Sequence, residues 1–459
     1  MNRFGTTTEL PLRVQPTLLA VGVPDPAEPV TLAEQRLKIA LAVGICLLLA
    51  FGPLALGAVD KWALCVLELG AALLLIIWAA GEIAQGQFEV TFNPLFIPAL
   101  LFGGLIAVQL LLKQSAYWYA TWQKALLWCA FGILLFLTSQ CLPQPALRKN
   151  VGLFFTVFGF IVALFAIVQL FMPNGKIYWV IPNQSGWPFF GPYINHSHYA
   201  GLMEMLVPFP LVFAMTHVWR RPVRVLFGFV ALIMASTIFL SLSLGGILGF
   251  AGEMLILAAL LARGRRSRQG LVWLALLGVF LAVWLTVLHP VGLMDRLTSL
   301  RSPMDKADAG VRAVIVKDSF RMVRQRPLLG WGLGTFSTVY PSFRSFYSED
   351  EVNAAHNDFM QLLVETGVIG FALMVFFVIL VYRDGMRSIE HWRRDPRASI
   401  TMAALIGCTG LLIHSLSDFN LQIPANAALF FALTAIATTG GTLGRHRLSG
   451  RLVSDKAKC

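Results

Sequence analysis

The sequence predicts an all-α polytopic membrane protein with about twelve transmembrane helices and one large helical loop. Three observations support this fold class. Hydrophobic residues make up 57% of the 459 residues and charged residues only 13%, whereas soluble domains carry roughly 25% charged residues. Apolar runs long enough to cross a bilayer recur along the chain. Lysine and arginine are distributed unevenly among the segments between these runs.

The apolar runs define the predicted spans and the segments between them. A helix is the expected form of each run, because a spanning segment must satisfy its backbone polar groups internally. The runs cover about 38–58, 62–80, 92–112, 125–141, 151–172, 199–217, 225–241, 245–262, 271–289, 367–382, 400–416 and 425–443. They divide the chain into an N-terminal tail (1–36), spans one to nine (37–289), a polar loop (290–366), spans ten to twelve (367–443) and a C-terminal tail (444–459).

The basic residues predict which side of the membrane each segment faces. With the N-terminus in the cytoplasm, 23 of the 36 lysines and arginines lie in inner segments, four in short outer loops and nine in the polar loop. Cytoplasmic loops are enriched in Lys and Arg, while long loops cross the membrane largely regardless of charge. We therefore expect both tails in the cytoplasm and the polar loop outside. This distribution accounts for the net charge of +12 without nucleic acid as a partner.

Cations gather in the first half of the polar loop, where residues 311–324 predict an amphipathic helix. Its expected apolar face consists of Val311, Val314, Ile315 and Met322, and its expected cations are Lys317, Arg321 and Arg324. These cations fit either a helix that lies on anionic lipid headgroups or an anion-binding site. Arg312 is expected at the helix start, where free backbone N–H groups favour an anion and a guanidinium can hold phosphate bidentately.

A histidine marks the second half of the loop. His356 lies just ahead of span ten, with Asn357, Asp358 and Glu365 close by in the sequence. A lone histidine is more often structural than catalytic, but this one is expected on the outer aqueous side at the membrane boundary. Neutral imidazole can take a proton from a hydroxyl, an effect worth roughly 10²–10⁴ in rate. We therefore consider His356 a candidate general base.

Two shorter outer segments carry further polar side chains. One holds Asn195, His196 and His198 at the start of span six, and the other holds His414 and Asp418 between spans eleven and twelve. Ionisable groups at membrane depth are costly and usually mark a site or a buried pair. His414 and Asp418 fit a substrate site and a helix-capping pair equally well.

The loop motifs resemble the signature region of the O-antigen ligase and polymerase family. The resemblance is carried by Arg326-Pro-Leu-Leu-Gly-Trp-Gly-Leu-Gly-Thr-Phe336 and by Ala355-His-Asn-Asp-Phe-Met-Gln-Leu-Leu-Val-Glu-Thr-Gly-Val-Ile-Gly370. Segments 195–201 and 414–418 are also similar to segments of that family. The likeness extends from about residue 152 to residue 437.

The resemblance implies a membrane glycosyltransferase with a GT-C-like helical bundle, without a metal or another cofactor. Such an enzyme moves a glycan from undecaprenyl pyrophosphate to an acceptor hydroxyl at the periplasmic face of the bacterial inner membrane. In ligases the acceptor is lipid A–core oligosaccharide or a similar glycan, and in polymerases it is another lipid-linked repeat unit. His356 matches the family's essential histidine, and Arg312 matches an arginine that contacts the pyrophosphate.

The same resemblance implies further substrate-binding residues. It also shows two positions at which this chain differs from many members of the family. The residues expected to bind substrate are Arg321, Arg296, His196, His198, Asn195, Asn357, Glu365, His414 and Asp418. Many relatives carry arginines where this chain has His196 and Leu244. Since a diphosphate needs positive charge, two alternatives stay open: His196, Arg296 or Arg321 compensates for the missing cations, or the donor differs.

The predicted chemistry is a single displacement with inversion at the anomeric carbon. His356 would act as base or would orient the acceptor, and Arg312, with help from Arg321, would hold the phosphate. The motifs fit ligase and polymerase equally well. A different class, a membrane transporter or an inactive scaffold, also stays open, because Glu68, Glu204 and Glu253 lie within apolar runs.

Overall fold

The computed structural model describes residues 32–183, 188–262, 275, 278–279, 283, 303–347, 351–439 and 447–451. This part of the chain is almost entirely helical. The helices are α1 (Leu32–Leu54), α2 (Lys61–Gln85), α3 (Phe96–Leu111), α4 (Trp118–Cys141), α5 (Pro145–Phe171), α6 (His196–Leu206), α7 (Pro208–Met215), α8 (Arg221–Leu240), α9 (Leu244–Ala262), α12 (Pro303–Gln325), α13 (Phe336–Val339), α14 (Asp358–Ser388), α15 (Pro396–His414) and α16 (Pro424–Thr438), with 3₁₀ turns η1 (Tyr340–Ser342) and η2 (Asn420–Gln422).

Two short antiparallel strand pairs accompany these helices. Strand β1 (Gln87–Thr91) pairs with β4 (Arg447–Arg451), and β2 (Lys176–Ile177) pairs with β3 (Ile181–Pro182). The first pair joins the segment after α2 to a segment beyond the last helix.

The chain is a multi-pass membrane protein. Among the described residues, nine helical segments are long and apolar enough to cross a membrane, with α6 and α7 together forming one of them. Two shorter apolar helices, α3 and α16, coincide with the predicted runs 92–112 and 425–443. The predicted run 271–289 lies almost entirely outside the described residues, as do most of both predicted tails. Eleven of the twelve predicted runs therefore overlap a described helix.

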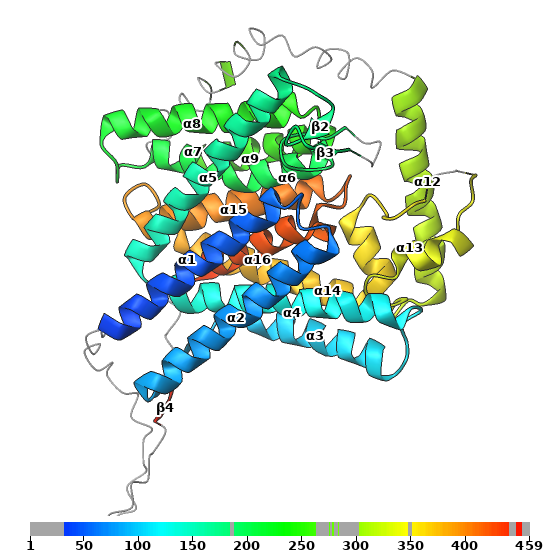
Figure 1. The fold of residues 1–459 in the computed structure, drawn as a ribbon, viewed down its shortest axis with the longest axis horizontal. Helices are drawn as coiled ribbons and strands as arrows, with labels where there is room; N and C mark the ends of the chain where they lie inside the picture. The colour runs from blue at the N-terminus through cyan, green and yellow to red at the C-terminus, as the bar shows by residue number, and fades with distance from the viewer. Residues whose placement is uncertain are drawn as a thin grey trace, which may run out of the picture.

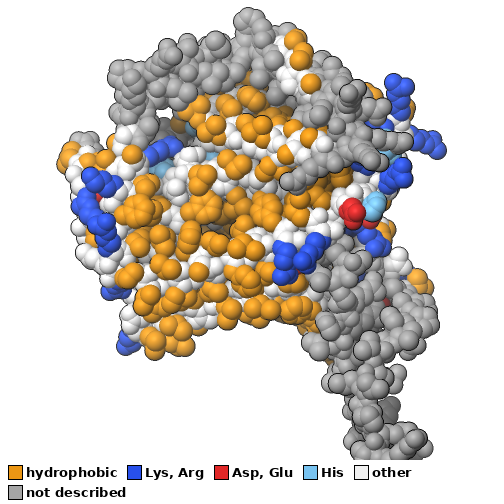
Figure 2. Space-filling view, turned by 180° about the vertical axis from the view of Figure 1, so that it is seen from behind, with side chains coloured by type: hydrophobic (Ala, Val, Ile, Leu, Met, Phe, Trp, Pro, Cys, Tyr) orange, Lys and Arg blue, Asp and Glu red, His pale blue; other side chains and the backbone are white. Residues whose placement is uncertain are grey.

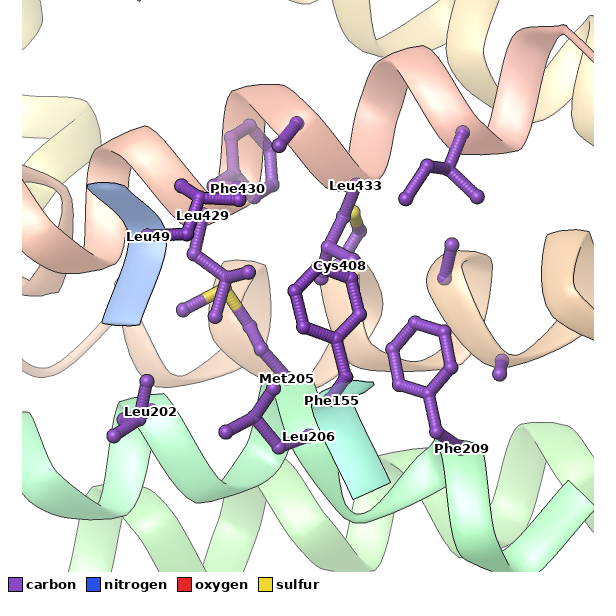
Figure 3. Packing of buried hydrophobic residues seen from close by; sticks show 14 of the residues in the cluster. Leu49, Phe155, Leu202, Met205, Leu206, Phe209, Cys408, Leu429, Phe430 and Leu433 are labelled. Atoms are coloured by element: carbon purple, nitrogen blue, oxygen red, sulfur yellow. The ribbon is translucent and has the colours of Figure 1, made fainter. Parts of the chain in front are cut away.

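The centre of the bundle is formed by the helices that bury the most apolar surface. Helices α6, α7, α15 and α16 are buried along most of their length, whereas α2 and α3 expose many large apolar side chains. Figure 3 shows this core, in which side chains from several helices, Leu49 of α1 among them, pack together. It includes Leu202, Met205 and Leu206 of α6, Phe209 of α7, Phe155 of α5, Cys408 of α15, and Leu429, Phe430 and Leu433 of α16.

The surface of the bundle fits a lipid environment. Large apolar side chains stand exposed along the outer helices, among them Leu69, Leu100 and Leu255. Figure 2 shows hydrophobic side chains across the middle of one face, with lysines and arginines gathered toward its sides. This pattern is expected where apolar surface contacts acyl chains and cations face water or headgroups.

Helices α12 and α13 stand at one end of the bundle (Figure 1). They have an apolar cluster of their own, which contains Ile315, Met322, Phe336, Val339, Tyr340, Ala355 and Val364. The predicted apolar face of α12 is confirmed at Ile315 and Met322 but is wrong at Val311, which is exposed.

The predicted helix start is also wrong, because α12 begins at Pro303. Arg312 therefore lies within the helix and gains nothing from free N-terminal N–H groups.

Helix α14 is interrupted at Gly367, where the family-like motifs meet. Gly367 has φ 64° and ψ −170°, and an added Cβ there would lie 2.2 Å from the Leu328 carbonyl oxygen. Only glycine adopts this backbone conformation without strain. Gly330 has a positive φ for a related reason, since a Cβ there would lie 2.4 Å from the Glu365 backbone. The glycine-rich motif is thus a tight turn packed against the interruption in α14.

Candidate functional site

The site forms around residues 414–421, which connect α15 to α16 and are named here the 414–421 segment. Side chains reach it from α6, from α12 and from the residues that begin α14. These elements are far apart in sequence, so the site exists only in the folded bundle. It lies at the end of the bundle that carries α12 and α13 (Figure 1).

Arg312 contacts this segment from α12. Its Nη1 donates a hydrogen bond to the Ser417 carbonyl oxygen at 3.0 Å. The side chain is half-buried. A guanidinium has five N–H donors, so this contact fixes the side chain while leaving donors for an anion.

His356 contacts the next residue of the same segment. Its Nδ1 lies 3.8 Å from Asp418 Oδ1, and 21% of its side chain is exposed. Nδ1 has no hydrogen-bond partner among the described residues, and the ring packs edge-on against Phe419 with centroids 5.1 Å apart. The residue has φ 49°, a region that costs a non-glycine residue of order 1 kcal/mol and clusters at functional sites.

The residues after His356 anchor α14 to the segment. Asn357 caps the helix, because its Oδ1 accepts from Met360 N at 2.9 Å, and its Nδ2 donates to the Leu416 carbonyl at 2.8 Å. Asp358 N donates to the Ser415 carbonyl at 3.0 Å, and Asp358 Oδ2 accepts from Leu421 N at 2.9 Å. These contacts fix His356 relative to Asp418.

Two further histidines surround the same segment from inside the bundle. His414 is fully buried and lies between two carboxylates, with Nδ1 3.1 Å from Glu204 Oε1 and Nε2 3.9 Å from Asp418 Oδ2. His198 is buried on the other side, where its ring packs edge-on against Phe419 with centroids 4.8 Å apart. His198 Nδ1 also lies 3.3 Å from Asn420 Oδ1.

Asp418 is the electrostatic centre of this cluster. Burial by itself would raise the pKa of its carboxyl, but the adjacent His356 side chain and the nearby His198 and His414 hold that pKa well below its usual range. The carboxyl is therefore ionised at neutral pH. An ionised carboxylate beside an imidazole orients the ring and stabilises the imidazolium that forms when the ring takes a proton.

Asn195 and His196 lie in an adjoining group rather than on the segment. Asn195 Oδ1 caps α6 by accepting from Ser197 N at 2.8 Å, and His196 Nδ1 lies 2.7 Å from the Ser241 carbonyl oxygen. Ser243 donates to Ser197 at 3.2 Å between hydroxyl oxygens. The two positions that depart from the family pattern, His196 and Leu244, therefore belong to one packed region.

Two predicted substrate-binding residues, Arg321 and Glu365, have other partners in the structure. Arg321 pairs with the buried Asp318, which also accepts from Ser345 N at 2.9 Å. Glu365 accepts from Gly334 N at 2.8 Å and from Phe336 N at 3.3 Å, so its carboxylate holds the glycine-rich turn. Arg296 lies outside the described residues.

The sequence did not predict the residues of the site that contact the histidines or hold the 414–421 segment in place. Glu204 was visible as a carboxylate within an apolar run, but its pairing with His414 follows from the packing of α6 on α15. Phe419, between the rings of His198 and His356, gives no signal in the sequence. Asp358 was noted only as a neighbour of His356.

The cluster offers three chemical functions in one place. Arg312 offers fixed positive charge for an anionic leaving group. His356 offers a partly exposed ring that can accept a proton. Asp418 offers an ionised carboxylate that can stabilise the protonated ring. This set suits transfer of a group from a phosphate to a hydroxyl.

A comparison with known families matches one stretch of the chain. Residues 229–375 match the family model described as O-antigen ligase. No curated protein matches the chain. The matched stretch contains Arg312 and His356 and ends before the 414–421 segment. This match supports the resemblance of the chain to the O-antigen ligase and polymerase family.

Proposed function

We propose that this protein is a glycosyltransferase that moves a glycan from undecaprenyl pyrophosphate to an acceptor hydroxyl, with lipid A–core or a similar glycan as the acceptor. The observation that carries the proposal is the convergence of Arg312 and His356 on adjacent residues. Arg312 binds the Ser417 carbonyl, and His356 faces the Asp418 carboxylate. A cation and a base held by one short segment can act on the two ends of a breaking glycosyl–phosphate bond.

The proposed reaction is a single displacement. The acceptor oxygen forms a bond to the anomeric carbon as the bond from that carbon to the pyrophosphate oxygen breaks. The hydroxyl proton passes to His356, and the electron pair of the broken bond leaves with undecaprenyl pyrophosphate. Attack from the face opposite the leaving group inverts the anomeric carbon.

Each side chain has a separate part in this step. Arg312 offsets the charge that develops on the departing diphosphate, an effect strongest where water is excluded. His356 takes the proton, and Asp418 stabilises the resulting imidazolium. His196 stands at one of the two positions where many relatives carry arginine, and its Nδ1 lies 2.7 Å from the carbonyl oxygen of Ser241, close in sequence to the other position, Leu244. We assign it a supporting contact to the donor.

The proposed location is the bacterial inner membrane, with both termini in the cytoplasm and the site facing the periplasm. The charge distribution supports this orientation, since 23 of the 36 basic residues fall on the side opposite the polar loop. The α12 end of the bundle would then meet substrate at the outer leaflet.

The test is a reconstituted reaction with purified protein, lipid-linked glycan donor and a lipid A–core acceptor. Wild-type protein is expected to yield glycosylated acceptor, and His356→Ala is expected to lose about 10²–10⁴-fold in rate. Full activity in His356→Ala would exclude the proposed base. A wild-type protein without transfer to any lipid-linked or lipid A–core acceptor would exclude the function.

The length of the glycan products distinguishes the two proposed kinds of acceptor, lipid A–core and another lipid-linked repeat unit. A ligase adds one block to the acceptor, whereas a polymerase yields a ladder of lipid-linked products. In cells, deletion of the gene is expected to remove the outer chain of lipopolysaccharide. Loss of a separate polysaccharide, with lipopolysaccharide intact, would indicate a polymerase instead.

A further inference from the structure

Carboxylates and imidazoles alternate along a path from the interior of the bundle to His356. Glu204 Oε1 lies 3.1 Å from His414 Nδ1, His414 Nε2 lies 3.9 Å from Asp418 Oδ2, and Asp418 Oδ1 lies 3.8 Å from His356 Nδ1. The side chains of Glu204 and His414 are wholly buried, that of Asp418 is 6% exposed and that of His356 is 21% exposed. Only the last member of the path meets the outside.

We propose that Glu204 and His414 are positioning residues for the transfer reaction. In this proposal, which rests on the proposed function, Glu204 fixes the ring of His414, His414 fixes the Asp418 carboxylate, and Asp418 orients His356. Neither Glu204 nor His414 touches substrate. The pair acts only through Asp418.

Two glycines of α9 create the space that this pair occupies. A Cβ at Gly245 would lie 2.4 Å from His414 Cδ2, and a Cβ at Gly249 would lie 2.6 Å from Glu204 Oε1. The two glycines stand four residues apart and so share one helix face. Small residues at this spacing allow membrane helices to approach closely. The close packing of α9 on α15 thereby holds the Glu204–His414 pair in one arrangement.

The pair has a reason to be rigid. A buried carboxylate accepting from Nδ1 fixes both the tautomer and the orientation of an imidazole, as outer partners do for metal-bound histidines. His414 Nε2 then lies 3.9 Å from Asp418 Oδ2, a distance at which the two groups interact through charge and not through a hydrogen bond. Asp418 Oδ1 accepts from Phe419 N at 2.9 Å and lies 3.8 Å from His356 Nδ1, so Oδ2 faces His414 while Oδ1 faces the other two groups. Without Glu204, the ring of His414 would be free to rotate. Asp418 would then lose the restraint that His414 provides and keep only the hydrogen bond from Phe419 N.

A double-mutant cycle tests whether Glu204 acts through Asp418. The assay measures kcat and both KM values for wild type, Glu204→Gln, Asp418→Asn and the double variant. Glu204→Gln is expected to lower kcat about 10-fold with both KM values within about 2-fold, and Asp418→Asn to lower kcat about 100-fold. The double variant is expected to match Asp418→Asn alone, because side chains in one network are not additive.

The matched control is Glu253→Gln. Glu253 is also a fully buried glutamate, on α9, and neither of its oxygens has a hydrogen-bond partner among the described residues. Its substitution is expected to leave kcat within about 2-fold of wild type. A Glu253→Gln defect equal to that of Glu204→Gln would indicate a general cost of changing buried carboxylates and would overturn the proposal.

Two results separate this proposal from the proposed function. If the wild type transfers glycan and the Glu204 and Asp418 defects multiply to about 1,000-fold in the double variant, the positioning role is overturned and the function stands. If the wild type has no transferase activity, the function itself fails. If the Glu204→Gln variant does not accumulate in membranes, His414→Gln takes its place in the cycle. The double variant of His414→Gln and Asp418→Asn is then expected to have the kcat of Asp418→Asn alone.

Discussion

Nδ1 of His356 lies 3.8 Å from Oδ1 of Asp418 although the two residues are 62 positions apart in the sequence. The carboxylate is buried and the ring is partly exposed. Contacts between the start of α14 and the 414–421 segment hold the two together. The proposed base and the carboxylate proposed to orient it are therefore brought together by the packing of two loops at the end of the bundle.

The first prediction concerns the charge on Asp418. Asp418→Asn is expected to lower kcat by about 10²-fold with little change in either KM, because the amide keeps the shape but cannot stabilise an imidazolium. Steady-state transfer assays with donor and acceptor varied in turn would measure both effects. An unchanged kcat would show that His356 works without this partner.

The second prediction uses pH to test the same carboxyl. Its pKa is lowered in the folded protein, so its stabilising effect is fully present above the unfolded value of about 3.9 and is lost as pH falls through the folded value. The difference in Tm between wild type and Asp418→Asn should thus not shrink as pH falls from about 8 to about 5, because the carboxyl stays ionised across this range. It should shrink below about pH 4. A difference that shrinks between pH 8 and pH 5 would contradict the lowered pKa.

The third prediction concerns Arg312 as the phosphate contact. Arg312→Lys keeps the charge but loses the planar pair of donors, so the donor KM is expected to rise about 10-fold while the acceptor KM stays unchanged. Inhibition by inorganic pyrophosphate should weaken in parallel. Lys317→Gln, which removes an exposed cation from the same helix, is the control and should leave the donor KM unaltered. Equal effects of both changes would point to general surface charge instead.

The fourth prediction assigns Glu365 to stability. In Glu365→Gln one carboxylate oxygen becomes an NH₂ group, which cannot accept from Gly334 N or Phe336 N. The variant is expected to lose about 1–3 kcal/mol of stability. Thermal unfolding in detergent would record the loss, and the donor KM of the remaining folded protein should be that of wild type. A raised donor KM at unchanged Tm would support direct substrate contact.

The fifth prediction concerns the interruption of α14. Gly367→Ala places a methyl group 2.2 Å from the Leu328 carbonyl oxygen and forces a backbone conformation that costs of order 1–3 kcal/mol. We expect a lower Tm and a lower yield of folded protein. Gly104→Ala in α3 is the control, since nothing lies within 4 Å of the added Cβ. Similar losses in both variants would indicate that any added methyl group is harmful.

The sequence predicted those parts of the molecule that depend on composition and local pattern. Apolar runs located eleven described helices, because membrane solvation dictates their length and polarity. The loop motifs led to Arg312 and His356, but the helix-start argument for Arg312 was wrong. It assumed that α12 begins where its apolar periodicity becomes visible, whereas the helix already includes the polar residues after Pro303.

The rest of the site depends on contacts between distant helices. The partners of His414 and Asp418 are set by glycines of α9 and by the docking of α14, and no local pattern encodes either. The surroundings of Glu365 also depend on contacts between distant segments. A carboxylate beside a candidate catalytic histidine suggested substrate contact, although its oxygens accept from backbone amides of a turn about 30 residues earlier.

The separate apolar cluster beneath α12 has a consequence for temperature. Ile315 and Met322 anchor α12 to α13 and to the start of α14, without help from the membrane core. A small satellite core can loosen by itself, because local opening requires less free energy than global unfolding. On warming, the proposed binding of pyrophosphate by Arg312 should be lost while the transmembrane helices remain assembled, so loss of activity would precede unfolding of the bundle.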